Sequence, residues 1–416
     1  MADFQQNTSG AAVSLGIGDK IKHFFIALKE VTKGGPLYYA WLLFLFTLIG
    51  MGIYGYSQQA MNGFIVTNIR YQVSWGFYIS NFTFLVGVAA AAVLLVIPAY
   101  LYHFKPIKEI AFLGEMMAIA AITMCMLFVT ADLGHPERAW HLLPPPIGKL
   151  NWPNSLLSWD IIVLNGYLFI NVTIFFFVLY KLYMRQSYEA IMPLIILSIP
   201  WAVSIHTVTA FIYNGLVARP YWNASILAPR FLASAFCSGP AIMILLFQVI
   251  RKQTKIDIDD KAIFRIAELV AYAMAVNLFF LGCEIFKEFY SNSVHLAPME
   301  YMFFGLHGHD ALVPWMRLAM GLNIFAFILF LRRKTRENFL FLNIGCLAVI
   351  IGIYLDKGLG VVIPGFTPDT LGEIYEYSPT KVEAMVAIGI FGVGALVYTF
   401  LLKFTLPIYT GQIKHP

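Results

Sequence analysis

The chain has 416 residues, of which 59% are hydrophobic and only 12% are charged, and its mean hydropathy is +0.73. Soluble domains usually contain roughly 25% charged residues, so this composition excludes a water-soluble fold. The excess of 28 Lys and Arg over 23 Asp and Glu is too small to indicate binding to nucleic acid. The length allows about ten bilayer crossings of roughly 20 residues each. We therefore expect an all-α integral membrane protein surrounded by lipid.

The first 33 residues lack the basic, apolar and small-residue pattern of a cleaved signal peptide. Residues 18–31 place their apolar side chains on one helical face, which is typical of a helix in the membrane interface. A solvated helical lead-in explains the same pattern. We expect residues 1–37 to form a cytoplasmic or interfacial N-terminal segment.

Apolar runs between charged and Pro- or Gly-rich clusters predict ten transmembrane helices. Their approximate ranges are 38–57, 75–101, 109–131, 159–181, 190–213, 230–250, 262–287, 312–331, 338–356 and 382–406. We expect eight of them to form a core at 38–331. Residues 332–416 then supply two further helices and the C-terminal tail.

The basic residues indicate how the chain is oriented. An even number of spans puts both termini on one side, and that side holds 18 of the 28 Lys and Arg residues. The opposite side holds 7, among them Arg230 and Lys357. Because cytoplasmic loops are enriched in Lys and Arg, we expect both termini to be cytoplasmic. The long connections, where binding surfaces usually lie, then face outward. They are 132–158, 214–229, 288–311 and 357–381.

Ionisable residues inside the spans are candidates for function because each costs roughly 2.5–3.5 kcal/mol at the centre of a membrane helix. They are Glu115, Asp160, His206, Arg265, Glu268, Glu284, Lys287 and Arg317. The pairs Arg265/Glu268 and Glu284/Lys287 are each three residues apart and can meet on one helical face. Each pair is therefore expected to form a structural ion pair, with a proton relay as the alternative.

His206 is the only histidine deep within a predicted span. A b-type haem between helices commonly needs two axial histidines, so we predict no haem in this chain. The four cysteines stand singly in apolar stretches without a CxxC or CxxCH motif, which also predicts no iron–sulfur cluster. They are Cys125, Cys237, Cys283 and Cys346. His206 is then either a hydrogen-bonded packing residue or part of a quinone or proton site.

Residues 130–160 form the densest polar segment of the chain and join the third and fourth spans. His135, together with Asp132 or Asp160, has the donors and the titratable groups that a quinone head needs. The alternative is purely structural: a helix end closed by the Gly and Pro of this segment, with Asp160 capping the next helix.

The run Asp-Leu-Gly-His-Pro-Glu-Arg at 132–138 resembles the signature of the NrfD/polysulfide-reductase membrane-subunit family. The stretch Asn154-Ser155 to Trp159-Asp160 resembles the element that follows it. Two further blocks, at 73–88 and at 199–211 with 228–240, are most similar to the ten-span branch found in sulfur-metabolism complexes of the Dsr and Qrc types. The resemblance covers roughly residues 36–330.

The resemblance implies a membrane subunit with two four-helix bundles in its core and without a redox cofactor of its own. It implies a menaquinone or ubiquinone site near the outer face, with His135 and Asp160 as the reacting residues. Asp132, Arg138 and His206 would support them. Where family members commonly have Arg, this chain has His135, which keeps a titratable group there.

The resemblance also implies partners and a location. A ferredoxin-like iron–sulfur subunit would dock at the outer face, accompanied by a multihaem cytochrome c and other membrane subunits. The complex would lie in the prokaryotic cytoplasmic membrane and serve anaerobic respiration. The chain would not be catalytic alone, and Glu115, Glu268 and Glu284 would be candidates for a proton path.

Two other functions are compatible with the sequence. A secondary transporter also has sparse charges within its spans, but its two halves usually show matching broken helices. The prolines here are scattered, and the halves of the chain show no clear symmetry. A structural membrane anchor with a degenerate quinone site would keep the outer loops and lose the quinone.

Overall fold

The computed structural model describes residues 28–410, apart from residues 30, 185, 255 and 294. Most of the predicted interfacial helix at 18–31 lies outside this range. In the described part of the chain the regular structure is helical throughout, and the one β-type pairing is an isolated bridge between Leu306 and His309. The predicted all-α fold is confirmed.

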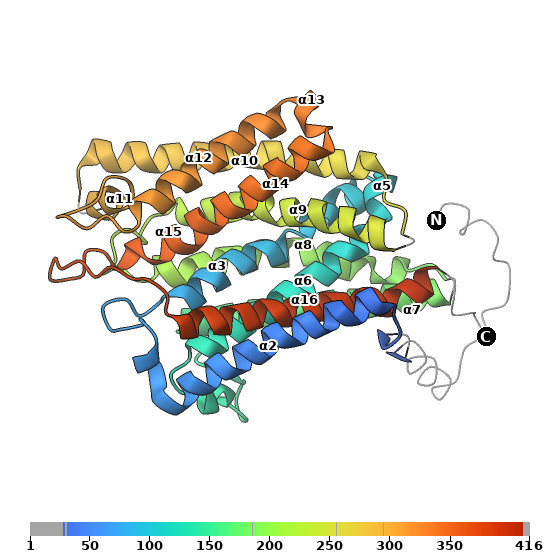
Figure 1. Ribbon diagram of the computed structural model, residues 1–416, viewed down its shortest axis with the longest axis horizontal. Helices are drawn as coiled ribbons and strands as arrows, with labels where there is room; N and C mark the ends of the chain where they lie inside the picture. The colour runs from blue at the N-terminus through green and yellow to red at the C-terminus, as the bar shows by residue number, and fades with distance from the viewer. Residues whose placement is uncertain (1–27, 30, 185, 255, 294, 411–416) are drawn as a thin grey trace.

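Ten helical segments within the described residues are long and apolar enough to cross a membrane (Figure 1), as the sequence predicts. Their helices are α2 (Pro36–Asn62), α3 (Phe77–Ala90) with α4 (Val93–Val96), α6 (Ala111–Asp132), α7 (Leu156–Tyr183), α8 (Met192–Asn214), α9 (Leu227–Gln253), α10 (Asp260–Ser291), α12 (Val313–Leu331), α14 (Phe339–Ile353) and α16 (Lys381–Tyr409). Shorter helices are α5 (Lys105–Lys108), α11 (Leu296–Phe303), α13 (Arg333–Arg336) and α15 (Gly360–Val362). The chain is a multi-pass integral membrane protein.

Eight of these spans form two four-helix bundles. In the first bundle α3 and α7 each pack against both α6 and α8. In the second bundle α9 and α12 each pack against both α10 and α14. Contact between α3 and α9 joins the bundles, and α2 with α16 forms an outer layer against α6 (Figure 1). The predicted pair of bundles is confirmed.

The division of the chain at residue 331 stays a prediction. The helices on its two sides pack together, since α14 closes the second bundle and α16 lies along α2.

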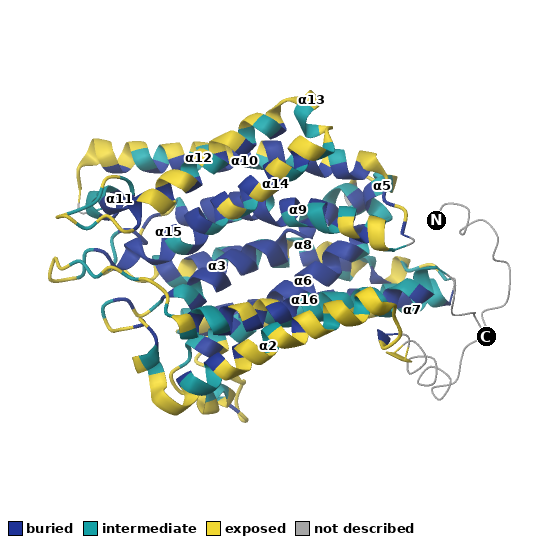
Figure 2. Cartoon of the chain, in the orientation of Figure 1, coloured by how far each residue is buried: buried dark blue, intermediate teal, exposed yellow. Residues whose placement is uncertain are grey.

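Burial differs sharply between the spans. In the most apolar stretch of the α3 span, 83% of the residues are buried, whereas in that of the α2 span only 11% are (Figure 2). Small side chains at Ala89–Ala92 let the neighbouring helices approach α3 closely. The α2 span instead exposes large apolar side chains such as Leu43 and Phe44, which suits a helix that faces lipid.

The long connections gather at one end of the molecule, which we call the loop end (left in Figure 1). They are residues 63–76, 133–155, 215–226, 292–312 and 367–380. The loop end corresponds to the outer face predicted from the basic residues, and this orientation remains a prediction.

The ninth span is longer than the sequence predicts. The expected end is residue 356, but the span continues through a π-helical turn, Tyr354–Leu359, and α15 as far as Phe366. Two buried side chains hold this extension: Trp222 donates to the Val361 carbonyl at 2.7 Å and Tyr221 to the Gly360 carbonyl at 2.9 Å. Lys357, expected in an outer loop, is therefore buried inside a span.

Helices α2 and α16 cross at a pair of glycines. A Cβ atom on Gly52 would lie 2.5 Å from the Cα of Gly389, and one on Gly389 would lie 2.4 Å from the Cα of Gly52. Nearer the start of α2, the indole nitrogen of Trp41 donates to the hydroxyl of Thr399 on α16 at 3.1 Å. The absence of side chains at the crossing lets the two backbones touch.

Replacing Gly52 with Val should separate these helices and destabilise the protein by about 1–3 kcal/mol, the usual cost of an overpacked contact. Thermal unfolding in detergent measures the effect. Gly50→Val is the matched control, because a Cβ at Gly50 of the same helix meets nothing within 4 Å. Equal losses in both variants would contradict the close crossing.

Candidate functional site

The predicted residues His135 and Arg138 lie on the surface of the loop end. Both side chains reach solvent, and Nδ1 of His135 lies 2.8 Å from a carboxylate oxygen of Glu137. Hydrogen bonds from its own backbone N–H and from His135 lower the pKa of Glu137. In the described residues no hydrogen bond or ion pair joins His135 to Asp132 or Asp160.

Asp132 is the last residue of α6. Its Oδ1 is buried and has no hydrogen-bond partner. The preceding carbonyl, of Ala131, accepts from Gln59 at 2.7 Å, and Gln59 accepts from Tyr78 at 2.7 Å. Asp132 also interacts electrostatically with Glu383 of α16. Asp132 thus follows directly on a buried hydrogen-bond chain, from Tyr78 through Gln59 to the Ala131 carbonyl, that joins the first bundle to α2.

Glu383 is fully buried at the start of α16, and several donors turn toward it. Its carboxylate accepts from the backbone N–H groups of Thr380 at 2.8 Å and Asn68 at 3.1 Å, and from the Tyr377 hydroxyl. Burial and the adjacent carboxylate raise the pKa of Tyr377, which keeps it a neutral donor. Glu383 therefore ties the start of α16 to the loop between α2 and α3.

Asp160 lies inside the first bundle, one turn into α7. It is 2% exposed and accepts a hydrogen bond of 2.7 Å from the Thr209 hydroxyl of α8. One turn further along α8, the hydroxyl of Tyr213 lies 2.6 Å from that of Thr83 on α3. Both Asp160 and Asp132 interact electrostatically with Tyr213. Asp160 is therefore held inside the first bundle by Thr209, whereas His135 stands apart from it on the surface.

His206 is fully buried on α8, and neither of its ring nitrogens has a hydrogen-bond partner. It interacts electrostatically with Lys357. The ammonium of Lys357 donates to the Phe231 carbonyl at 3.1 Å and lies 4.8 Å from the centre of the Phe231 ring. A Cβ on Gly87 would lie 3.0 Å from this ammonium, so the glycine leaves room for it. Lys357 consequently lies where α3 and α9 join the two bundles.

A buried ion-pair cluster closes the loop end of the second bundle. Arg230 of α9 binds Glu284 of α10 through one terminal nitrogen and Asp356 of the π-helical turn, at 2.5 Å, through the other. All three residues are buried. Because one cation faces two carboxylates, the cluster carries an excess of negative charge when all three are ionised.

This cluster corrects the predicted pairing of Glu284 with Lys287. Glu284 binds Arg230, and the half-exposed Lys287 binds the adjacent Glu288 at 3.0 Å. The other predicted pair is confirmed, since Arg265 donates to Glu268 at 2.5 Å.

Sequence reasoning missed Arg230, Asp356 and Lys357 as interior groups. It assigned Arg230 and Lys357 to the outer side and ended the ninth span at Asp356, because charge usually marks a span end. One signal could have corrected this: the apolar run Leu359–Ile363 directly after the charges. π-Helical turns occur frequently at functional sites. The π-helical turn Tyr354–Leu359 directs Asp356 toward Arg230 and Lys357 toward the junction of the two bundles.

The predicted proton-path residues lie in separate places. Glu115 is buried on α6 in the first bundle with one oxygen unpartnered, and it interacts electrostatically with Tyr167. Glu268 and Glu284 are both on α10, roughly 24 Å apart along the helix. Glu268 is partly exposed at the end opposite the loops and also accepts from Tyr272 at 3.1 Å.

No three His, Cys, Asp or Glu side chains of the described residues gather as a group that could hold a metal ion.

The fold consists of two four-helix bundles within ten membrane spans, and both bundles contain buried ionisable side chains. These features define a polytopic helical membrane protein with ionisable groups in its interior. The model of the family described as Polysulphide reductase, NrfD, matches residues 65–367, which take in the spans from α3 to the end of the ninth. The chain belongs to this family.

Curated relatives match along most of the chain. A selenate reductase subunit of Mesobacillus selenatarsenatis is 25% identical over 420 residues, covering 90% of this chain and 95% of the relative. A putative dimethyl sulfoxide reductase membrane subunit of Halobacterium salinarum is 23% identical, covering 89% and 92%. The Hdr-like menaquinol oxidoreductase integral membrane subunit of Archaeoglobus fulgidus is 21% identical, covering 91% and 95%.

Arg230→Met should destabilise the protein by about 3–5 kcal/mol, because it leaves two carboxylates buried without their cation. The measurement is thermal unfolding in detergent. Arg333→Met is the control, since the pair of Arg333 with Glu337 is largely exposed and contributes little.

Replacing all three members, as Arg230→Met, Glu284→Met and Asp356→Leu together, should recover part of the lost stability. A triple variant less stable than the single one would contradict the assigned cause.

Proposed function

We propose that the chain is the quinone-interacting membrane subunit of a multi-subunit respiratory redox complex. The family supports this, and so do the relatives, which are named as membrane subunits of reductases and of a menaquinol oxidoreductase. The observation that carries the proposal is the burial of Asp160 within the first bundle, bonded to Thr209 and beneath the polar segment 133–155. A buried carboxylate at membrane depth is costly, which makes Asp160 a candidate for function.

We place the proposed quinone at the loop end of the first bundle. A quinone head needs hydrogen-bond partners for its carbonyls and a nearby route for protons, and it supplies the two-electron chemistry when bound. Asp132 keeps a buried oxygen without a partner, and His206 keeps two such nitrogens. We assign proton handling to Asp160 and His135, with Asp132, Arg138 and His206 in support.

His135 contributes from the surface. Its contact with Glu137 holds the imidazole on the short helix Pro136–Leu142 that follows α6. From there His135 can exchange protons with the outer solvent, while Asp160 holds a proton in the interior.

Proton movement across the membrane forms a further part of the proposal. We assign Glu115, Glu268 and Glu284 to the path, with Glu115 serving the first bundle and the other two the second. Lys357 is buried between the bundles, where its ammonium donates to the Phe231 carbonyl of α9 beside Gly87 of α3, and this position supports a role in linking them.

The loop end is our proposed docking face for the partners: a ferredoxin-like iron–sulfur subunit, a multihaem cytochrome c and other membrane subunits. Exposed tryptophans, which are enriched at protein interfaces, support this assignment. They are Trp140, Trp152 and Trp159, at 48%, 53% and 37% exposure. We further propose a role in sulfur metabolism and anaerobic respiration in a prokaryotic cytoplasmic membrane, with menaquinone as the leading quinone.

Native purification in mild detergent tests the proposal, with mass spectrometry of co-purifying subunits and extraction of bound quinone. We expect iron–sulfur partners and quinone with the unaltered chain. The double variant His135→Ala with Asp160→Asn should retain the partners and lose most of the quinone. His141→Ala, in the same loop-end segment, is the matched control and should keep it.

The other outcomes separate the alternatives. A chain that purifies alone and without quinone would favour a transporter. Partners without quinone in the unaltered complex would favour a structural anchor.

A further inference from the structure

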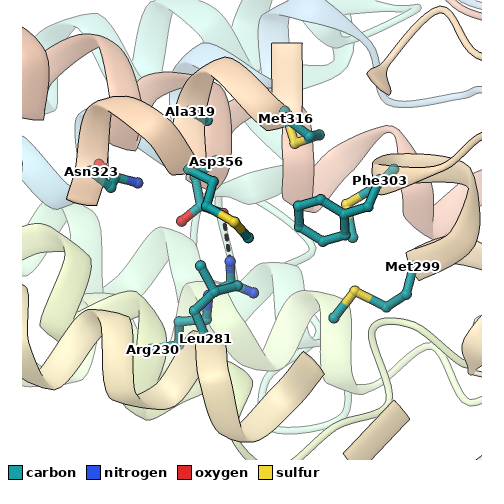
Figure 3. Close-up of a pocket in the computed structure, with 10 residues that line it drawn as sticks. Arg230, Leu281, Met299, Phe303, Met316, Ala319, Asn323 and Asp356 are labelled. Carbon is teal, nitrogen blue, oxygen red and sulfur yellow. Dashed lines mark hydrogen bonds and ion pairs between the residues drawn. The ribbon is translucent and has the colours of Figure 1, made fainter. Parts of the chain in front are cut away.

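A small cavity lies at the loop end of the second bundle, beside the buried ion-pair cluster (Figure 3). The space open to the centre of a water molecule is about 10 Å³, which is enough for about one water. Three polar side chains line the cavity, Arg230, Asn323 and Asp356, and the rest of its wall is apolar and rich in methionine. Any ligand of this size therefore lies close to polar groups.

Asn323 is the polar group of this wall that the fold leaves without a partner. Its side chain is fully buried, and among the described residues neither its amide nitrogen nor its amide oxygen has a hydrogen-bond partner. Buried polar groups are almost always hydrogen-bonded, to protein or to an ordered water, because an unpaired one bears the full cost of its desolvation. The amide of Asn323 thus needs a partner from the cavity.

The helices of the second bundle differ in how they meet the ion-pair cluster. Arg230 comes from α9, Glu284 from α10 and Asp356 from the π-helical turn after α14. Asn323 comes from the fourth helix, α12. Its oxygen lies against Gly352, where a Cβ would be 2.4 Å from it, and Gly352 is about one turn before Asp356. Asn323 therefore lies next to the cluster.

The cluster keeps hydrogen-bonding capacity on the side of the cavity. Asp356 binds Arg230 through one carboxylate oxygen, and its side chain is 12% exposed, against 3% for Glu284. A carboxylate accepts through both oxygens, and a guanidinium has five N–H groups, so the two ion pairs do not use all of them. In Figure 3 the Asn323 side chain points toward the Asp356 carboxylate. A small ligand between them can bond to both.

The charges of the cluster favour a neutral ligand. A cation in the cavity would lie beside the guanidinium of Arg230, and an anion would face the carboxylates of Glu284 and Asp356. Water is neutral, fits the volume and can both accept from an amide N–H and donate to a carboxylate. A water that bridges two protein groups is enthalpically nearly as good as a direct hydrogen bond.

We propose that one water molecule binds in this cavity and bridges the Asn323 amide of α12 to Asp356 of the π-helical turn. The bridge gives α12 a polar link to the cluster, which the other three helices of the bundle have through the ion pairs of Arg230. The site goes beyond the proposed function and does not depend on it, because it rests on the cavity, on the unpaired amide and on the cluster.

Cryo-electron microscopy of the intact complex, at a resolution that shows ordered waters, tests the proposal. A density peak should lie within hydrogen-bonding distance of both Asn323 and Asp356, about 2.5–3.2 Å. Asn323→Leu keeps the approximate size of the side chain but removes the amide, and it should lose most of this peak. Met316→Leu is the matched control, because Met316 belongs to the apolar wall of the same cavity, and it should keep the peak.

Thermal unfolding in detergent gives an independent readout. Asn323→Leu should lower the melting temperature by a few degrees, because the bridge from α12 to the cluster is lost. Without a bound water the same change should raise the melting temperature, since it would replace an unpaired buried amide by an apolar side chain of similar size. The sign of the shift therefore separates the two cases.

The absence of a peak in the unaltered complex, beside clear peaks for other buried waters, would overturn the site. A peak that Asn323→Leu leaves unchanged, or a higher melting temperature of that variant, would overturn the role of Asn323. A peak with the many short oxygen contacts of a metal ion would overturn the assignment to water. Should Asn323→Leu fail to fold, the peak in the unaltered complex and in Met316→Leu decides the matter.

Discussion

The double ion pair of Arg230 is the interaction on which the second bundle depends. It joins α9 to α10 through Glu284 and to the π-helical turn after α14 through Asp356. A charge within a hydrocarbon layer is costly unless a partner faces it, so these three segments have to meet at one depth. This requirement explains the unusual end of the ninth span. The π-helical turn keeps Asp356 in the interior, where it binds Arg230, before the chain reaches the loop end.

The same turn connects the two bundles. Asp356 and Lys357 are adjacent, yet the first binds Arg230 and the second lies over Phe231 and against Gly87 of α3. The π-helical turn therefore contacts both bundles, through Asp356 in the second bundle and through Lys357 at their junction.

The outer layer has a different physical basis. Helices α2 and α16 meet through glycines, and α2 exposes large apolar side chains such as Leu43 and Phe44, which carry no penalty in lipid. The fully buried Glu383 secures this layer, since its backbone donors come from the start of α16 and from the loop before α3. Backbone packing holds the layer along its length, and hydrogen bonds hold it at the loop end.

The sequence by itself determined the ten spans and the all-helical fold, because a bilayer requires about 20 apolar residues per crossing whatever surrounds them. It also determined the Arg265–Glu268 pair, since residues three apart meet on any helix. The partner of Glu284 is 54 residues away in the chain, and the end of the ninth span depends on Trp222 and Tyr221. Only the tertiary structure decided these features, because hydropathy records what a residue costs in lipid and not which distant group compensates that cost.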